Sequence, residues 1–222
     1  MRKSVAIITF NRCNKLRMEI LLATFSALFS VVNPFGAMPV FLTLTQDDTP
    51  DHRNQMALRA SMFMVLILAV FFFAGQYVLN FFGLRIHDLR IAGGIMLLKA
   101  GFDLLTTKSE PGKKISKDVV EEGIQKDDIS FTPLAMPMLS GPGAIAVSIG
   151  MFTKSLSYLN MAVTLAAIIL VAVASYFILV SSHRLTAFMG KAGLAALSKI
   201  MGFITLAIGA NFITSALIAV FK

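Results

Sequence analysis

Apolar residues gather in six long stretches that short polar connections separate. The stretches are residues 20–43, 58–79, 86–105, 131–152, 158–180 and 200–221. A helix rises about 1.5 Å per residue, and the hydrocarbon core of a bilayer is roughly 30 Å thick, so each crossing needs about 20 apolar residues. Every stretch has that length, and the pattern predicts about six transmembrane segments.

The predicted segments are helices rather than barrel strands. In hydrocarbon every backbone N–H and C=O group must be satisfied within the protein, which restricts spanning structures to helices and closed barrels. Barrel strands are about 10 residues long and alternate apolar with polar positions, whereas these stretches are longer and uniformly apolar. We therefore expect an all-α, multi-pass protein with a single membrane domain over residues 18–222.

A polar segment divides the chain into two halves, residues 18–105 and 131–222. Residues 106–130 between them carry five lysines and six acidic residues, which belong in water. Proline and glycine interrupt the first stretch of each half, because proline removes a backbone donor and clashes with the preceding turn. The breakers are Asn33-Pro34-Phe35-Gly36 and Pro39 in the first half, and Pro133, Pro137 and Ser140-Gly141-Pro142-Gly143 in the second.

A shift of 108 positions superimposes landmarks of the two halves. It places Pro34 on Pro142, Gly94 on Gly202, Gly101 on Gly209 and Asp103 on Asn211. Most other pairs at this shift differ, so the argument depends on the coincident breakers and glycines. Three crossings are an odd number, so a second copy would enter the membrane from the opposite side. The sequence predicts an inverted repeat of two three-helix units.

Composition excludes several classes of function. The chain is 56% hydrophobic and 14% charged, with a mean hydropathy of +0.77, so a soluble domain would expose much of its apolar content. The single Cys13 excludes a disulfide framework, and the three histidines lie too far apart for a short metal motif. The net charge of +8 lies in tails and connections without a basic face. We expect no metal, cofactor or nucleic-acid partner.

The two breaks are the main candidates for a binding site. Unwinding a helix frees N–H and C=O groups, which is tolerated where the break lines a cavity or is packed inside protein. Half-helix N-termini attract an anionic group and exposed carbonyls attract a cation, a combination that suits an amino acid. The alternative at each position is a packed proline kink. The candidate residues are Asn33, Pro34, Gly36, Ser140, Gly141, Pro142 and Gly143.

Polar residues within the apolar stretches add two candidates, Asp103 and Asn211. Asp103 follows Lys99 by four positions and could pair with it near the membrane surface, or could bind a proton or a substrate ammonium group. Asn211 could hydrogen-bond another helix or the solute. Arg90 opens its stretch and is interpreted as a head-group anchor, with carboxylate binding as the alternative.

Four glycines repeat one spacing in the two halves. Gly94 and Gly101 are seven positions apart, as are Gly202 and Gly209, so each pair returns to nearly the same face of its helix. Small residues on one face let membrane helices approach closely. We expect these glycines to pack helices together.

Taken in order, these motifs resemble those of the MarC family. They are Asn33-Pro34-Phe35-Gly36, Arg90-Ile91-Ala92-Gly93-Gly94, Pro133-Leu134-Ala135-Met136-Pro137 and Ser140-Gly141-Pro142-Gly143-Ala144-Ile145, with a weaker match at Met201-Gly202-Phe203. The resemblance covers the chain from residue 18 onwards. It implies a bacterial or archaeal inner-membrane protein of six helices, similar to LysE-type exporters. Some relatives are described as transporters of small neutral amino acids.

Residues 1–17 form a basic extension that precedes the usual family beginning, and this comparison leads us to expect Met18 as the initiator. The connections after the first, third and fifth stretches hold ten Lys and Arg residues. The opposite side holds four without the extension and nine with it. Only the shorter start gives a clear positive-inside bias, which places both termini outside and residues 106–130 in the cytoplasm.

The leading hypothesis is a secondary transporter or exporter of a small solute such as a neutral amino acid. The chain has no GxxxxGK[ST] nucleotide motif, so an ion gradient or the solute's own gradient would supply the energy. An enzyme would need nucleophiles, bases or metal ligands inside the stretches, and we assign no catalytic residue. The alternative is a non-transporting scaffold that docks a partner through its charged loop. The coupling ion and a homo-oligomeric state stay open.

Overall fold

The computed structural model describes residues 2–106, 128–152 and 158–221, which are helical apart from short connections. The helices are α1 (Arg2–Val32), α2 (Pro34–Leu44), α3 (Pro50–Phe81), α4 (Ile86–Thr106), the π-type segment η1 (Ser130–Leu139), α6 (Pro142–Phe152), α7 (Tyr158–Val180) and α8 (Ser182–Val220). These described parts of the chain contain no strand. The prediction of an all-α fold is confirmed.

Four helices in the described residues are long and apolar enough to cross a membrane. They are Arg17–Met38, Pro50–Phe81, Tyr158–Val180 and Ala195–Val220. Ser130–Leu139 and Pro142–Met151 together make a fifth candidate, a broken span or re-entrant loop bent by 65°. Helix α4 has 21 residues but carries Arg90, Lys99 and Asp103, and this charge keeps it out of that class. The multi-pass membrane architecture is confirmed, whereas the count of six stays a prediction.

Helix α3 begins earlier than its apolar stretch predicts, because its first turn is polar and capped. It begins at Pro50 rather than near residue 58, and the Thr49 hydroxyl accepts a hydrogen bond from the His52 N–H (3.3 Å). Helix α8 begins at Ser182, but non-helical backbone at Gly190 (φ 64°, ψ 174°) divides it, and its apolar part lies after this kink. At α3 the apolar pattern marks the part of the helix that needs lipid or core, and the cap decides where the helix starts.

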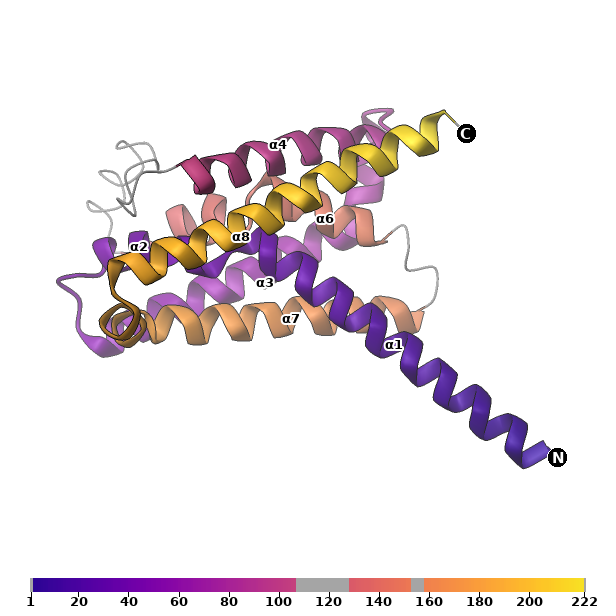
Figure 1. Ribbon diagram of the computed structural model, residues 1–222, viewed down its shortest axis with the longest axis horizontal. Coiled ribbons are helices and arrows are strands. Elements are labelled where there is room, and N and C mark those ends of the chain that lie inside the picture. Colours follow the sequence, from indigo (N-terminus) through magenta and orange to yellow (C-terminus); the bar gives the residue numbers. More distant parts are fainter. Residues whose placement is uncertain (1, 107–127, 153–157, 222) are drawn as a thin grey trace.

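Helices α4 and α8 lie antiparallel, side by side over one face of the bundle (Figure 1). Their backbones come close where the four predicted packing glycines meet. A Cβ atom added to Gly94 would lie 2.8 Å from the carbonyl oxygen of Gly209, and one added to Gly101 would lie 2.7 Å from that of Gly202. Such distances leave no room for a side chain, so glycine is what permits this contact.

Most contacts between two helices have a counterpart between the matching helices of the other half. The shift of 108 positions relates Pro34–Leu44 to Pro142–Phe152 and the start of α3 to the start of α7. Helix α1 contacts α7 as η1 contacts α3, and α2 contacts α7 and α8 as α6 contacts α3 and α4. Helix α3 contacts its counterpart α7, and α4 contacts α8. A two-fold relation between the halves would produce this pattern, so the contacts are consistent with the predicted inverted repeat.

The core lies where both breaks meet α3 and α7. Its buried side chains come from seven of the helices and include Leu28, Phe41, Leu68, Leu134 and Ile168. Large apolar side chains also cover the outside of the bundle, such as those of Leu66, Phe102 and Phe203. In water this outer surface would be costly, but in a bilayer it is the surface that contacts lipid.

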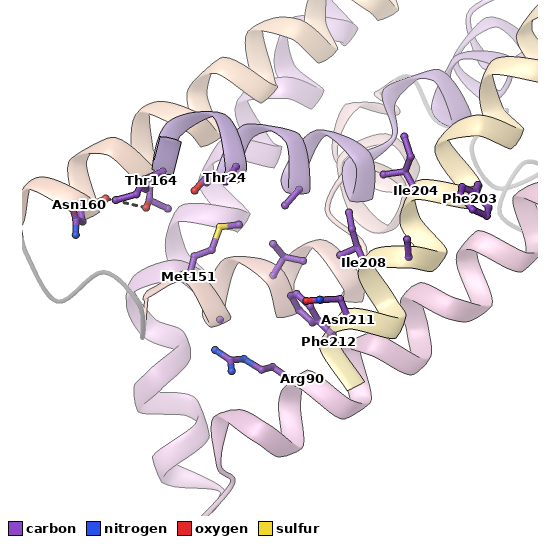
Figure 2. A pocket seen from close by; sticks show the side chains of 16 residues that line it. Thr24, Arg90, Met151, Asn160, Thr164, Phe203, Ile204, Ile208, Asn211 and Phe212 are labelled. Atoms are coloured by element: carbon purple, nitrogen blue, oxygen red, sulfur yellow. Dashed lines mark hydrogen bonds between the residues drawn. The ribbon is translucent and has the colours of Figure 1, made fainter. Parts of the chain in front are cut away.

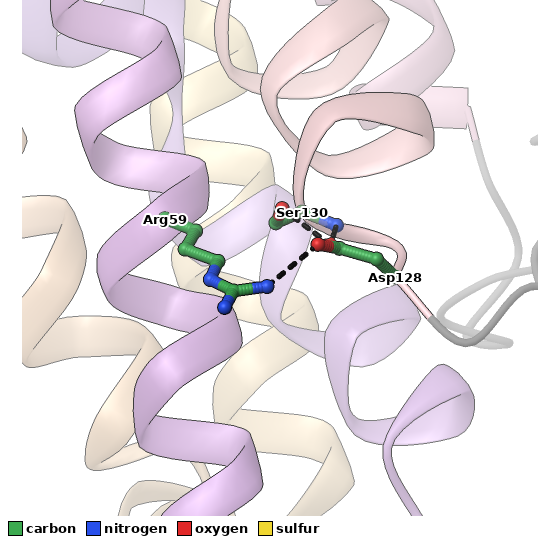
Figure 3. A network of polar contacts seen from close by, with 3 residues as sticks. All are labelled: Arg59, Asp128 and Ser130. Carbon is green, nitrogen blue, oxygen red and sulfur yellow. Dashed lines mark hydrogen bonds and ion pairs between the residues drawn. The ribbon is translucent and has the colours of Figure 1, made fainter.

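Polar contacts tie down the ends of several helices. Arg53 of α3 donates to the carbonyl oxygens of Thr45 (2.8 Å) and Gln46 (3.0 Å), which closes the C-terminal end of α2. Its Nη1 atom also lies 2.6 Å from Nε2 of His183 at the start of α8. Arg59 forms an ion pair with Asp128 (2.8 Å), just before η1 (Figure 3). Arg53 and Arg59 lie in the first three turns of α3, whereas Asp128 and His183 lie outside the candidate spans.

Candidate functional site

The first break is a single residue, Asn33, between α1 and α2. Its dihedral angles (φ 46°, ψ 65°) lie in the left-handed region, which asparagine tolerates better than most residues. Its side-chain Oδ1 accepts a hydrogen bond from the Gly36 N–H (3.2 Å), and its carbonyl oxygen accepts from the Ala37 N–H (3.3 Å). Pro34 follows at a position where no backbone donor is needed. The chain therefore caps the start of α2 itself.

Pro34 also frees a carbonyl group in α1, and a side chain satisfies it. In a continuous helix the Ser30 carbonyl would accept from the N–H of residue 34, which proline lacks. The Thr205 hydroxyl of α8 lies 3.0 Å from this carbonyl oxygen and 2.8 Å from that of Met201, so its single proton is shared between the two acceptors. Because Thr205 is buried, the bond connects the first break to the second half of the chain inside the bundle.

The second break joins η1 to α6 and lacks such a cap. The position that matches Asn33 is Gly141, which has no side chain, and the match to Gly36 is Ala144. Among the described residues no side chain hydrogen-bonds to the N–H of Gly143 or Ala144. The N-terminus of α6 therefore keeps free donors and the positive end of the helix dipole.

Ser140 lies at this second break and is fully buried. Its N–H bonds to the Ala135 carbonyl (2.8 Å), but its hydroxyl has no hydrogen-bond partner in the described part of the chain. Among the described residues, Ser61 within α3 and Ser182 at the junction of α7 and α8 also have buried hydroxyls without a partner, and neither lies at the two breaks near Pro34 and Pro142. A buried hydroxyl without a partner costs about 1–3 kcal/mol, and in native proteins it usually marks a bound water or ligand.

The two breaks lie close to each other. A Cβ atom added to Gly143 would lie 3.4 Å from Cγ1 of Val31, two residues before Asn33, and 2.5 Å from Cδ2 of Leu97 on α4. The start of α6 therefore packs against both α1 and α4. Asn33, Pro34, Gly36, Ser140, Gly141, Pro142 and Gly143, the candidates predicted at the breaks, gather in one region of the bundle.

A cavity of about 610 Å³ lies between these breaks and one end of the bundle (Figure 2). Five helices line it: α1, α4, α6, α7 and α8. Most of the lining is apolar, with neutral polar groups from Thr24, Asn160, Thr164 and Asn211. The one charged side chain among the described residues that line it is Arg90.

Of the predicted binding residues, Asn211 lines the cavity and the others do not. Helix α1 borders the cavity up to Ala27, and helix α6 borders it from Val147 onwards, so both breaks lie about two turns deeper. Asp103 lies on an exposed part of α4 and is not among the residues that line the cavity. We did not predict Thr24, Asn160 or Thr164, although each is a polar residue within an apolar stretch.

Comparison with known proteins agrees with this membrane architecture and with the motif resemblance. Residues 18–221 match the family described as "MarC family integral membrane protein". The chain belongs to the MarC family. The match begins at residue 18, so residues 1–17 lie outside it.

Relatives within the MarC family occur in archaea and bacteria. The chain is 32% identical over 200 residues to a UPF0056 membrane protein of Methanocaldococcus jannaschii, covering 90% of this chain and 97% of the relative. It is 31% identical to YvbG of Bacillus subtilis (89% and 93% covered) and 32% identical to YhcE of Escherichia coli (89% and 91% covered). The relatives' names state membrane location and no activity. No solved structure matches the chain.

Proposed function

We propose that this MarC-family protein is a secondary transporter of a small solute, with neutral amino acids as the expected class. The observation that carries the proposal is the second helix break. There a fully buried Ser140 hydroxyl and the uncapped N-terminus of α6 have no partner among the described residues. The first break, by contrast, is capped by its own chain.

The second break offers complementary groups for a zwitterion. The N–H groups of Gly143 and Ala144, with the Ser140 hydroxyl, are donors at the positive end of a helix and suit a carboxylate. Pro142 has no N–H to bond with the carbonyl of Met138 four residues earlier, and such a carbonyl suits an ammonium group. A neutral amino acid carries both charges on one small molecule.

The cavity supplies a route to this site from one side of the bundle. Thr24, Ala27 and Thr164 border the open cavity. In the other half the position that matches the partly exposed Ala27 is Ala135, which is fully buried in the core. At this pair of positions the first half is more open than the second. If the halves exchanged these arrangements the opposite side would open, which is alternating access by an inverted repeat.

The test is flux in proteoliposomes that contain the purified full chain. We expect saturable counterflow of radiolabelled alanine or glycine, and its dependence on imposed proton and sodium gradients identifies the coupling ion. Ser140→Ala should raise the half-saturating concentration by about 10-fold or more, because a hydrogen bond to a charged group contributes roughly 1.5–3 kcal/mol. Ser182→Ala, which removes another buried, unpaired hydroxyl, is the matched control and should leave flux unchanged.

Two results would contradict the proposal. If neither amino acid moves in a folded wild-type protein, the transport function is wrong and the scaffold alternative is favoured. That alternative relies on the charged loop, of which residues 107–127 lie outside the described parts of the chain. If flux occurs and Ser140→Ala behaves like Ser182→Ala, the second break is not the binding site.

A further inference from the structure

Arg90 is a cation placed in a mostly apolar cavity. It reaches in from α4, opposite the part of α1 that carries Thr24 (Figure 2). Its guanidinium group makes no hydrogen bond or ion pair with any residue that the structure describes. The acidic residue nearest to it in sequence, Asp88, accepts a hydrogen bond from the Arg85 N–H (2.8 Å). Unpaired charge in such surroundings is costly, and within membrane proteins it usually marks a functional site.

We propose that Arg90 makes this cavity a binding site for a singly charged oxyanion, namely the carboxylate of a small solute with an apolar body. The planar guanidinium group can donate two parallel hydrogen bonds to a carboxylate. Side chains such as those of Ile20, Met151 and Ile208 line the rest of the cavity and would contact the apolar part. A volume of about 610 Å³ lies within the usual range for small-molecule sites.

The charge belongs to one half of the chain only. The position that matches Arg90 in the second half is Ser198, and the position that matches the cavity residue Asn211 is Asp103. Scaffold symmetry therefore does not require a cation here. The described lining contains no acidic side chain, so Arg90 gives the cavity its positive charge. Building on the proposed transport function, the cavity would capture the solute's carboxylate before the solute reaches the second break.

An anionic phospholipid head group carries the same type of charge, so the experiment must separate the two sources. The direct test is equilibrium binding of radiolabelled propionate and of radiolabelled alanine to the purified full chain in detergent. Propionate has the carboxylate without the ammonium group. Alaninamide, which has the ammonium group without the carboxylate, is the competitor. This measurement does not depend on transport.

We expect Arg90→Gln to weaken the binding of both carboxylates by about 10-fold or more, with Arg90→Lys in between, because lysine keeps the charge and loses the planar fork. Alaninamide should not compete. Arg85→Gln removes the same charge five positions earlier, outside the cavity lining, and should bind like the wild type. Equal melting temperatures of all the variants exclude unfolding as the cause.

Several outcomes would overturn the site. Wild-type protein that binds neither carboxylate, an Arg90→Gln protein that binds propionate normally, or effective competition of alaninamide against propionate would each do so. If Arg90→Gln lowers only the amount of co-purified phosphatidylglycerol, measured by mass spectrometry, Arg90 is a lipid anchor. If binding depends on Arg90 but no flux occurs, the Arg90 site stands and the transport function is refuted. If flux occurs but binding does not depend on Arg90, the transport function stands and the Arg90 site is refuted.

Discussion

The two helix breaks begin with the same proline and end differently. At Pro34 the preceding Asn33 folds its side chain back onto the Gly36 N–H, so the start of α2 is closed. At Pro142 the preceding residue is Gly141, and the start of α6 keeps its donors beside the Ser140 hydroxyl, which has no partner in the described part of the chain. The proposed function assigns separate roles to the two helix starts. The first is a structural joint, and the second would hold the ligand.

Two residue differences between the breaks explain why only the first break is capped. A Cβ atom on Gly36 would lie 2.5 Å from Nδ2 of Asn33, so the capping side chain requires glycine three residues later. The second break has glycine where the first has asparagine, and alanine where the first has glycine. The methyl group of Ala144 is tolerated because no capping side chain lies above it. Each break is thus consistent within itself, and neither residue can be changed independently.

The α4–α8 contact is the region where the two halves should behave alike. Substitutions there should cause the largest loss of stability. A Cβ atom on Gly101 would lie 2.7 Å from the Gly202 carbonyl oxygen, and one on Gly209, its counterpart, 2.9 Å from that of Gly94. Because backbone atoms cannot move aside, Gly101→Ala and Gly209→Ala should each destabilise the protein by about 1–3 kcal/mol. Thermal unfolding of the purified protein measures this.

Gly150→Ala is the control for these two substitutions. It lies in α6, and a Cβ atom there would meet nothing within 4 Å, so alanine should be neutral or stabilise the helix by up to about 1 kcal/mol. Matched losses at Gly101 and Gly209 would support a shared packing role in the two halves. A cost no larger than that of Gly150→Ala would refute the close backbone contact between α4 and α8.

The membrane helices, the helix breaks and the packing glycines could be predicted from the sequence because they depend on local chemistry. The length of each apolar stretch indicates membrane helices, and proline chemistry predicts the interruptions near Pro34 and Pro142. Glycine spacing predicts a packing face, but it does not give the partners. The shift that aligns Gly94 with Gly202 makes them equivalent positions, whereas Gly94 contacts Gly209, because equivalent helices run antiparallel.

The cavity and the caps depend on residues far apart in the sequence. Thr24, Arg90 and Asn160 come from different helices, and their meeting point follows from how five helices pack. The Asn33 cap involves neighbouring residues, yet its counterpart is absent at the second break, and sequence alone gave both breaks the same role. The unpaired state of the Ser140 hydroxyl is likewise visible only once every possible partner has a position.

The cap at the first break should produce a smaller, strongly coupled effect. Gly36→Ala should destabilise the protein by about 0.5–2 kcal/mol, because the new methyl group displaces the Asn33 side chain. Asn33→Gly, which keeps the left-handed backbone accessible, should cost only a few tenths of a kcal/mol. In the double variant, which copies the second break, the added cost of Gly36→Ala should vanish because no cap remains to be displaced.

A double-mutant cycle on melting temperature and chemical unfolding measures that coupling. Asn33→Ala serves as a comparison, because alanine loses the cap and also disfavours the left-handed backbone by about 1–2 kcal/mol. It should therefore be less stable than Asn33→Gly. Additive effects of Asn33→Gly and Gly36→Ala on stability would mean that the Asn33 cap is not the reason why position 36 requires glycine.

The smallest effect concerns how each break is approached along the chain. The first is reached through the continuous helix α1, whereas the second follows Asp128, whose carboxylate accepts hydrogen bonds from the Ser130 N–H (2.9 Å) and hydroxyl (Figure 3). These bonds, led by that from the hydroxyl and helped by Arg59, lower the pKa of Asp128, and burial opposes them only in part.

Because the pKa of Asp128 is lower in the folded state, its contribution to stability is present above the unfolded value of about 4 and is lost as the pH falls through the folded value. The exposed Arg59–Asp128 pair limits the effect to less than about 1 kcal/mol, and salt should reduce it. Asp128→Asn should therefore destabilise the protein slightly at neutral pH, and this cost should shrink as the pH falls below about 4. Ser130→Ala should remove more of this pH dependence than Arg59→Gln does, since the Ser130 hydroxyl is the largest cause. Equal stability of wild type and Asp128→Asn at every pH would show that the start of η1 needs no such contact.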